Sequence, residues 1–518
     1  MRMTYFIIFR YCTLFNKYVP LQPDSRQYLI LIINTLKVQK TMKIFKNFIG
    51  LAALALCLGF ASCSSDDDAP SYSNVAVSNS ELMTILKAKG YQFDENGKML
   101  LDDKANSTTS LDLSGTKVDT AALKELSVFP NLKELNLSSN GYGPVFHIAS
   151  LPSQITGLDL QGNDIYDFDG LVTAKVENDE VKATILHEFT KLYLPASCKY
   201  NVEDLMPFYT QNEAENKTVD MQMVNDKGSL EKYNTLREVP DEYFRTFLKQ
   251  TLPRIFTADD KIDISIPMAK MDMANFQLMF ANQYADIDKI QSIEGLEYVI
   301  NNPYYPSNYI VFGYEGGEHQ YTLGYLMPRN NITTLWLTQT TTLGLDLSGA
   351  TSITNLKLTK NQNISVLDLS NTIIANQNPA DFDANLGNAL NCLDCPKLET
   401  IVLPTPNKGV IESIELRDLP ALKKVDLSSI YATNEIVLLN LGNGDIVFPT
   451  LTHYYYNKAG VPTLESFDNT ENQIGLAVSQ DVFDKEVTKT FITSYKNHLK
   501  SLWVSYRKVG AIKWDRLI

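Results

Sequence analysis

The stretch LKELNLSSN, residues 132–140, sets the pattern LxxLxLxxN on which the interpretation of the chain depends. The stretch ITGLDLQGN, residues 155–163, repeats it, and the central leucines Leu111, Leu135 and Leu158 are 24 and 23 residues apart. Successive side chains of a strand point to opposite faces of a sheet. The alternation therefore predicts short strands that turn both leucines of each LxL triplet toward one side.

An asparagine closes each of these units, namely Asn140 and Asn163. Its amide can satisfy backbone N–H and C=O groups where the chain turns. One coil cannot bury its own apolar edge, so such coils are expected to stack. Period and pattern together resemble leucine-rich repeats, and this resemblance implies an α/β-type solenoid with parallel short strands.

The pattern returns after residue 330 with about half the earlier period. Leu335, Leu345, Leu356 and Leu367 recur at intervals of 10, 11 and 11 residues. We interpret this as coils with two strands each, one on either side of a flattened solenoid. The half period resembles the repeats of Bacteroidetes surface proteins. CPKLETIVLP, residues 395–404, resembles the BspA-like variant, in which a Cys-x-x-Leu segment leads to a strand ending in Leu-Pro.

Two segments have the composition of small helical amino-terminal caps. In SNSELMTILKAKG, residues 78–90, Ser78 or Ser80 is the expected helix cap, and VPDEYFRTFLKQTL, residues 239–252, carries an apolar stripe at helical spacing. Solenoid ends expose apolar edges and need such caps. Two caps predict two tandem arrays, and the alternative is one continuous solenoid with a large insertion.

The predicted organisation runs from a leader to a carboxy-terminal cap. Residues 1–41 are expected not to be translated, because translation is expected to start at Met42. The segments that follow are 42–62, a lipoprotein signal peptide; 63–77, an acidic tether; 78–211, the first cap and array; 212–238, a polar linker; 239–330, the second cap with a tyrosine-rich hairpin; 331–450, the second array; and 451–518, a carboxy-terminal cap.

The stretch LALCLGFASCSSDDD, residues 54–68, ends an apolar run at Cys63. Lysines precede this run, and it is shorter than the roughly 20 apolar residues that span a bilayer, so it predicts an export signal. FASC resembles a lipobox, which implies that Cys63 is lipidated; the alternative is an ordinary cleavage site before an incidental cysteine. The five residues after Cys63 resemble the address by which Bacteroidetes send lipoproteins to the outer face of the outer membrane. They are Ser64, Ser65, Asp66, Asp67 and Asp68.

The chain has 46 basic and 60 acidic residues, a formal net charge of −14. The predicted signal is basic, so the exported chain would be more acidic still. A surface with this negative charge repels phosphate groups and disfavours nucleic acid as a partner. In the exported chain, Cys198, Cys392 and Cys395 would follow the lipidated cysteine. The pair in CLDC permits a redox or zinc interpretation, but the repeat frame favours packing, with Cys395 inward in place of a leucine and Cys392 pointing elsewhere.

Three short motifs have the residue types of ion-binding or modification sites. DENGK, residues 94–98, predicts a turn, and DDKID, residues 259–263, resembles a decayed acidic loop; neither fits an EF-hand. No metal or cofactor is expected, and calcium dependence stays open. The stretch DTA resembles the Bacteroidetes acceptor motif for O-glycosylation, which would place the sugar on Thr120.

The first candidate ligand surface consists of side chains between the inward leucines. Alternation along strands predicts that Trp336 and Lys357 share one face, while Asp346 and Asp368 share another. These aspartates equally suit a structural role, as hydrogen-bond acceptors for the neighbouring coil.

The second candidate is the segment 301–328, which predicts a β-hairpin around Gly316 and Gly317. Exposed tyrosines give rigid contact area with a polar tip, but the same rings can fill the core of a cap. The tyrosines are Tyr304, Tyr305, Tyr309, Tyr314, Tyr321 and Tyr325.

Taken together, the resemblance implies a lipid-anchored outer-membrane protein, exposed on the cell surface, that binds protein or glycan ligands, host-derived ones among them. No catalysis is expected. The alternative is a structural or accessory subunit of an outer-membrane envelope or glycan-uptake assembly, which a stable co-purifying envelope partner would favour.

Overall fold

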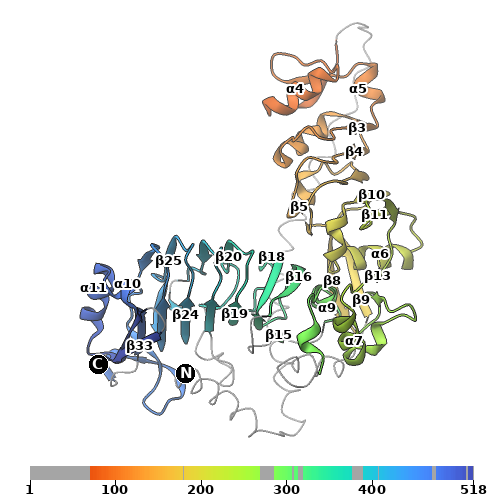
Figure 1. Ribbon diagram of the computed structural model, residues 1–518. Coiled ribbons are helices and arrows are strands. Elements are labelled where there is room, and N and C mark those ends of the chain that lie inside the picture. The colour runs from red at the N-terminus through yellow and green to blue at the C-terminus, as the bar shows by residue number, and fades with distance from the viewer. Residues whose placement is uncertain are drawn as a thin grey trace, which may run out of the picture. The chain divides into compact units, whose positions relative to one another are not determined.

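The computed structural model describes residues 70–178, 180–268, 285–305, 309–312, 319–375, 389–406, 408–469, 474–508 and 511–516 (Figure 1). The chain divides into Met1–Pro70 and a second compact unit, Ser71–Ile518, which holds every described helix and strand. The predicted signal peptide, Cys63 with its serine and aspartate run, and Tyr314 lie outside the described residues. In the described part, no helix has both the length and the apolar character needed to cross a membrane.

The described residues form a mixed α/β fold with few helices and many short parallel strands. A six-stranded sheet has the order β12-β11-β10-β6-β4-β3 and is parallel except for β12. Its strands are β3 (Ser110–Asp112), β4 (Glu134–Asn136), β6 (Gly157–Asp159), β10 (Lys191–Leu194), β11 (Asp220–Val224) and β12 (Leu230–Lys232). We call it the first sheet.

The first sheet aligns one apolar residue from each parallel strand. Leu111 pairs in register with Leu135, Leu135 with Leu158, Leu158 with Leu192, and Leu192 with Met221. All five side chains are at most 3% exposed. The inward orientation predicted for Leu111, Leu135 and Leu158 is confirmed.

Two asparagine side chains join neighbouring turns of the chain. Asn140 Nδ2 donates to the carbonyl of Leu137 at 2.8 Å and to that of Leu113, one strand earlier, at 3.1 Å. Asn163 Nδ2 donates to Leu160 O at 2.8 Å and to Leu137 O at 3.1 Å, and its Oδ1 accepts from Asn140 N at 3.0 Å. The predicted role of these asparagines at the turns is therefore confirmed.

Both predicted helices are present. In α4 (Ser80–Ala88) the cap is Asn79, whose side chain accepts from Leu82 N, so the prediction of Ser78 or Ser80 was wrong by one residue. In α7 (Glu242–Thr251), Asp241 Oδ1 accepts from the first-turn N–H groups of Tyr243 and Phe244. An acidic N-cap accepts from N–H groups that would otherwise be unpaired, and its negative charge interacts favourably with the positive end of the helix dipole.

The segment 212–238 is not a polar linker. Helix α6 (Leu205–Ala214) runs into it, and β11 extends the first sheet with Met221 buried. Strand β13 (Leu236–Arg237) pairs with β14 (Ile262–Asp263). The segment is polar because alternate residues face solvent, and even Arg237 is buried, donating to Tyr233 Oη at 3.1 Å.

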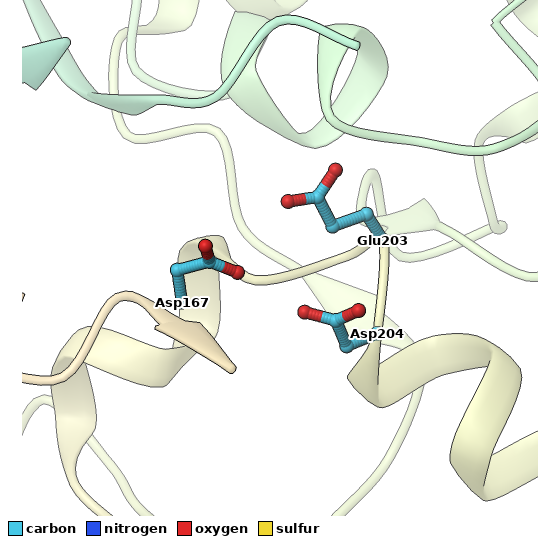
Figure 2. A group of neighbouring side chains, drawn as sticks. All are labelled: Asp167, Glu203 and Asp204. Atoms are coloured by element: carbon cyan, nitrogen blue, oxygen red, sulfur yellow. The ribbon is translucent and has the colours of Figure 1, made fainter. Parts of the chain in front are cut away.

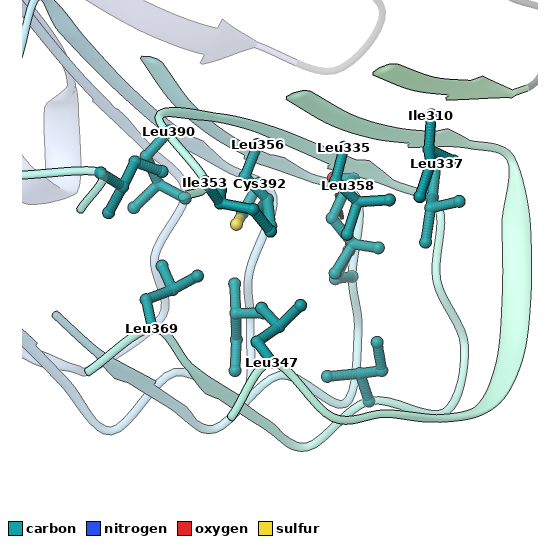
Figure 3. Close-up of a cluster of buried hydrophobic side chains, with 14 of the residues drawn as sticks. Ile310, Leu335, Leu337, Leu347, Ile353, Leu356, Leu358, Leu369, Leu390 and Cys392 are labelled. Carbon is teal, nitrogen blue, oxygen red and sulfur yellow. Dashed lines mark hydrogen bonds between the residues drawn. The ribbon is translucent and has the colours of Figure 1, made fainter. Parts of the chain in front are cut away.

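A second, nine-stranded sheet within the described residues has the order β15-β17-β19-β21-β24-β27-β31-β32-β33. Its strands are β15 (Tyr309–Phe312), β17 (Thr334–Thr338), β19 (Asn355–Thr359), β21 (Ala389–Leu393), β24 (Ser413–Arg417), β27 (Glu435–Leu439), β31 (Ile474–Ser479), β32 (Leu499–Lys508) and β33 (Ala511–Arg516). All neighbours are parallel except β32 and β33. Figure 3 shows the row Ile310, Leu335, Leu356 and Leu390 on one side of the core, facing Leu347 and Leu369.

Successive strands in this part of the chain belong in turn to three sheets, not to the two that were predicted. After β24 come β25 (Lys424–Asp426) and β26 (Ile430–Thr433), and after β27 come β28 (Asp445–Val447) and β29 (His453–Tyr456). The β25 and β28 strands belong to the sheet β20-β22-β25-β28, whereas β26 and β29 belong to β23-β26-β29-β30. The prediction of two strands per coil missed the third because IYAT and HYYY bury Ala432 and Tyr454 instead of leucines.

The turn predicted around Gly316 and Gly317 lies outside the described residues, but the strands on either side of it do not pair with each other as a hairpin requires. Strand β15 pairs parallel with β17, and β16 (Tyr321–Leu326) pairs parallel with β18 (Thr340–Leu345) in another sheet. Each strand buries apolar side chains in the core, such as Ile310 from β15 and Leu323 from β16. Burial against successive strands thus outweighs the local turn signal.

The frame predicted for CLDC was shifted. Cys392 pairs in register with Leu358 and is fully buried, so it occupies the inward position, while Leu393 pairs with Thr359 (Figure 3). Cys395 is buried as well, just beyond the strand. Packing, which was preferred over redox or zinc chemistry, agrees with this burial.

The remaining elements complete the described chain. They are β1 (Tyr72–Ala76), β2 (Lys98–Leu100), α5 (Asp103–Ser107), η1 (Thr120–Val128), β5 (Val145–His147), η2 (Ile148–Ser150), β7 (Asp167–Asp169), β8 (Val172–Glu177), β9 (Glu180–Ile185), η3 (Ala196–Tyr200), η4 (Pro253–Ile255), η6 (Ile287–Lys289), α9 (Leu296–Ile300), β20 (Val366–Asp368), β22 (Thr400–Val402), β23 (Gly409–Val410), β30 (Pro462–Ser466), η8 (Phe467–Asn469), α10 (Gln480–Phe483) and α11 (Glu486–Tyr495).

Replacing Asn140 by Ala should lower the free energy of unfolding by about 2–4 kcal/mol, because it removes one donor from each of the carbonyls of Leu113 and Leu137 and leaves the N–H of Lys117 without its acceptor. Urea unfolding of the purified chain measures this. The matched control is Asn136→Ala on the outward side of β4, where the side chain accepts only from Ser138 N in its own turn, and a loss under about 1 kcal/mol is expected. Equal losses for the two variants would contradict the structural role of Asn140.

Candidate functional site

The nine-stranded sheet brings Trp336 and Lys357 together. The two residues are register partners on β17 and β19, and Lys357 Nζ lies 5.7 Å from the centroid of the Trp336 ring. Trp336 Nε1 donates to Asn355 Oδ1 at 2.7 Å, which fixes the ring. Both side chains are half-buried. The prediction that they share a face is confirmed, and a cation–π contact of about 0.5–1 kcal/mol orients them.

The row of register partners continues across the sheet. Lys357 is followed by Asn391, Glu415 and Val437 on successive strands. Arg417 Nη1 lies 3.4 Å from Glu415 Oε1. This face therefore presents an indole, a cation, an amide and a carboxylate side by side, separated by the roughly 4.8 Å between neighbouring strands.

The aspartates after the inward leucines have a local task. Asp346 Oδ1 accepts from Ser348 N at 2.8 Å, and Asp368 Oδ1 accepts from Ser370 N at 2.9 Å. The expected structural role, as hydrogen-bond acceptors, is confirmed for both aspartates. The donor, however, is the backbone N–H two residues later in the chain and not a group of the neighbouring coil. Such side-chain turns explain why Asp recurs where strands end.

Three of the five candidate tyrosines that the structure describes are buried. Tyr305, Tyr321 and Tyr325 are 4%, 1% and 8% exposed, so of the two alternatives left open by the sequence these three rings follow the second and fill the core. Tyr304 is half-buried, and its hydroxyl accepts from Val181 N at 3.2 Å. Tyr309 is half-buried on β15.

Tyr325 belongs instead to an aromatic stack at the join of the two predicted arrays. Its ring lies 4.1 Å from that of Tyr166, at an interplanar angle of 15°. Tyr200 stacks on Tyr166 at 6.2 Å, and Tyr298 on Tyr200 at 6.0 Å. The four rings come from segments far apart in sequence, so the tyrosines stabilise the packing of residues 166–200 against residues 298–325.

Three carboxylates meet beside this stack (Figure 2). Asp167 is the first residue of β7, while Glu203 and Asp204 directly precede α6. One carboxylate oxygen from each of the three residues lies within 4.8 Å of those of the other two. Arg329 Nη1 lies 2.7 Å from Glu203 Oε2, and Asn201 Nδ2 donates to Asp204 Oδ2 at 2.9 Å.

The carboxylates of this cluster hold protons tightly. Burial raises the pKa of Glu203 to about 8, although the Arg329 guanidinium opposes the rise. Burial, followed by the charges of Glu203 and Asp167, raises the pKa of Asp204 well above its usual range. The pKa of Asp167 is raised as well, again chiefly by burial. Close carboxylates in partly buried surroundings disfavour the state in which all of them are ionised.

The cluster is also the one arrangement among the described residues with carboxylates spaced for a metal ion. Oxygen ligands of this kind suit a hard cation such as Ca²⁺. The sequence predicts no metal here, because Asp167 and the pair Glu203 and Asp204 lie in separate segments without a spacing motif. The adjacent acids in NVEDL, residues 201–205, were the only local signal.

Other sequence candidates have ordinary surroundings. Thr120 is half-buried at the start of η1, where Asp119 Oδ1 accepts from Ala121 N. The DENGK stretch forms the predicted turn, with Asp94 Oδ1 accepting from Asn96 N and Lys98 N. In the second acidic stretch, Asp260 pairs with Lys249.

Comparison with protein-family models, curated proteins and solved structures gives no match for this chain.

Neutralising Asp204 should stabilise the protein in a pH-dependent way. A carboxyl whose folded pKa is raised gives up stability as pH rises from the unfolded pKa toward the folded one, because the unfolded chain ionises first. Asp204→Asn should therefore raise the free energy of unfolding by roughly 1–3 kcal/mol at pH 8 and by little at pH 4. Urea titrations at the two pH values measure this.

The control for that experiment is Asp259→Asn, since Asp259 is exposed to solvent. It should change stability equally little at both pH values. A destabilising Asp204→Asn at pH 8 would show that the carboxylate is ionised and compensated in the native protein.

Proposed function

We propose that the chain is a leucine-rich repeat solenoid, similar to the BspA-like group of Bacteroidetes, that binds protein or glycan ligands without catalysis. Support for the solenoid comes from the register of the parallel strands. In both sheets, each strand places an apolar residue directly beside that of the next strand. The asparagine contacts at the turns of the first sheet fit the same architecture, since stacked coils share hydrogen bonds only with their neighbours.

The observation that carries the binding proposal is the row Trp336, Lys357, Asn391 and Glu415 on the nine-stranded sheet. Interfaces gain most from aromatic and cationic side chains held in one orientation. Here the indole is held by Asn355 and covered by Lys357, so little conformational entropy remains to be lost on binding.

The proposed location is the outer membrane, through lipid on Cys63, with the chain facing outward. Its support is the order of lysines, apolar run, small residues, cysteine and acidic run in residues 43–68. Partners would then be proteins or glycans met outside the cell, host-derived ones included.

Protease treatment of intact cells tests the location. The native protein should be cleaved, and a variant with Asp66, Asp67 and Asp68 replaced by Ala should be protected. Protection of both would contradict surface exposure and move the search for a ligand to the periplasm. A stable envelope partner that co-purifies with the protected protein would favour the structural or accessory role.

The binding face is tested by Trp336→Ala and Lys357→Met on any ligand identified by a screen of host proteins and glycans. Each substitution should weaken binding by about tenfold or more, as expected for anchor side chains. Val447→Ala on β28, at an exposed position of another sheet, is the matched control and should leave affinity unchanged. Normal affinity of both face variants would exclude this face.

A further inference from the structure

Five neighbouring strands of the nine-stranded sheet end in the same unusual way. Thr338, Thr359, Leu393, Arg417 and Leu439 are the last residues of β17, β19, β21, β24 and β27, and they are register partners. The next residue in each case has a left-handed backbone, with φ between 53° and 60°. These residues are Gln339, Lys360, Asp394, Asp418 and Asn440, and none is glycine.

The left-handed residues extend the hydrogen bonding of the sheet by one step. Lys360 N donates to Leu393 O at 2.8 Å, Asp394 N to Arg417 O at 2.9 Å, and Asp418 N to Leu439 O at 2.9 Å. These bonds use the backbone alone, so glycine would make them equally well. A non-glycine residue in this conformation costs roughly 1–2 kcal/mol. Asn and Asp tolerate this conformation best among non-glycine residues, so the backbone geometry accounts for Asp394, Asp418 and Asn440 but not for Gln339 and Lys360.

Four of these five residues, all but Gln339, line one groove. It has a volume of about 480 Å³ and runs across the carboxyl ends of four adjacent strands, β19, β21, β24 and β27. Its walls include Lys360, Asp394, Asp418, Asn440, Pro396 and Pro420, together with two glutamines. Asn440 Nδ2 donates to Asp418 Oδ1 at 2.7 Å, so neighbouring side chains hold one another in place. A groove lined by polar side chains from four successive strands is a candidate binding site.

Spacing and polarity identify the class of ligand. Neighbouring strands lie about 4.8 Å apart, so the groove offers a polar side chain at each such step, whereas an extended peptide advances only about 3.3 Å per residue. An extended β-1,4-linked sugar chain advances by nearly the strand spacing. The named lining residues provide hydrogen-bonding groups and two prolines, and the apolar proline rings can pack on the C–H face of a sugar. Their net charge is negative, which disfavours an anionic polymer.

We propose that this groove binds an extended, uncharged, β-1,4-linked oligosaccharide, with Asp394, Asp418 and Asn440 bonded to hydroxyl groups of successive sugars. The proposal rests on the ligand-binding function proposed above and gives it a second surface, separate from the Trp336 face. It specifies which of the two ligand classes this surface takes.

Calorimetric titration of the purified full chain with cellohexaose and chitohexaose tests the proposal. At least one should bind, and polygalacturonate, an anionic chain, should not. Absence of binding by both hexamers overturns the proposal. Because the assay uses purified protein, it does not depend on surface location: binding in solution combined with protection from protease on cells would overturn only the proposed location.

Glycine substitutions separate a binding role from a folding role. Asp394→Gly and Lys360→Gly remove lining side chains and relieve left-handed strain, so the thermal midpoint should stay nearly unchanged while affinity falls about tenfold or more. Lys117→Gly is the matched control, because Lys117 is also left-handed, with φ of 58°, and lies outside the groove; it should leave affinity unchanged. Full affinity in Asp394→Gly and Lys360→Gly, or a large loss of stability with unchanged affinity, would overturn the assignment.

Discussion

The fold depends on one constraint: a strand of three to five residues cannot bury its apolar side chains or pair its backbone alone. Each strand solves both problems only by lying in register beside the next. Asn140 shows how closely the solutions are linked, since one amide bonds the carbonyl of its own turn and that of the turn before. Loss of register would expose leucines and orphan buried carbonyls together, so the two sheets can vary in their loops and edges but not in the inward rows.

This constraint also decides where function can reside. Inward rows are committed to packing, and the aspartates beside them are committed to local turns. The surfaces left over are the outward row of the nine-stranded sheet and the ends of its strands. Trp336 and Lys357 occupy the first, and the left-handed residues from Lys360 to Asn440 occupy the second. Both surfaces repeat at the strand spacing, so both suit an elongated ligand better than a compact one.

A repeated local pattern was enough to predict the features that depend on it alone. The rows through Leu135 and Leu158, the asparagine turns, two helices and the pairing of Trp336 with Lys357 all belong to this class. Prediction from the sequence failed where long-range packing overrode a local signal: Cys392 took the inward position, and residues 212–238 joined the first sheet. The acidic cluster was beyond sequence reasoning, because only folding brings Asp167 to Glu203 and Asp204.

The burial of the described cysteines has a consequence for the reactivity of the folded protein. Cys198, Cys392 and Cys395 are free thiols without access to solvent, and burial raises the pKa of each. A thiol that is neither ionised nor accessible does not exchange with disulfides. These three thiols are therefore protected from exchange in the folded protein, and they are open to a wrong cross-link only while the chain folds.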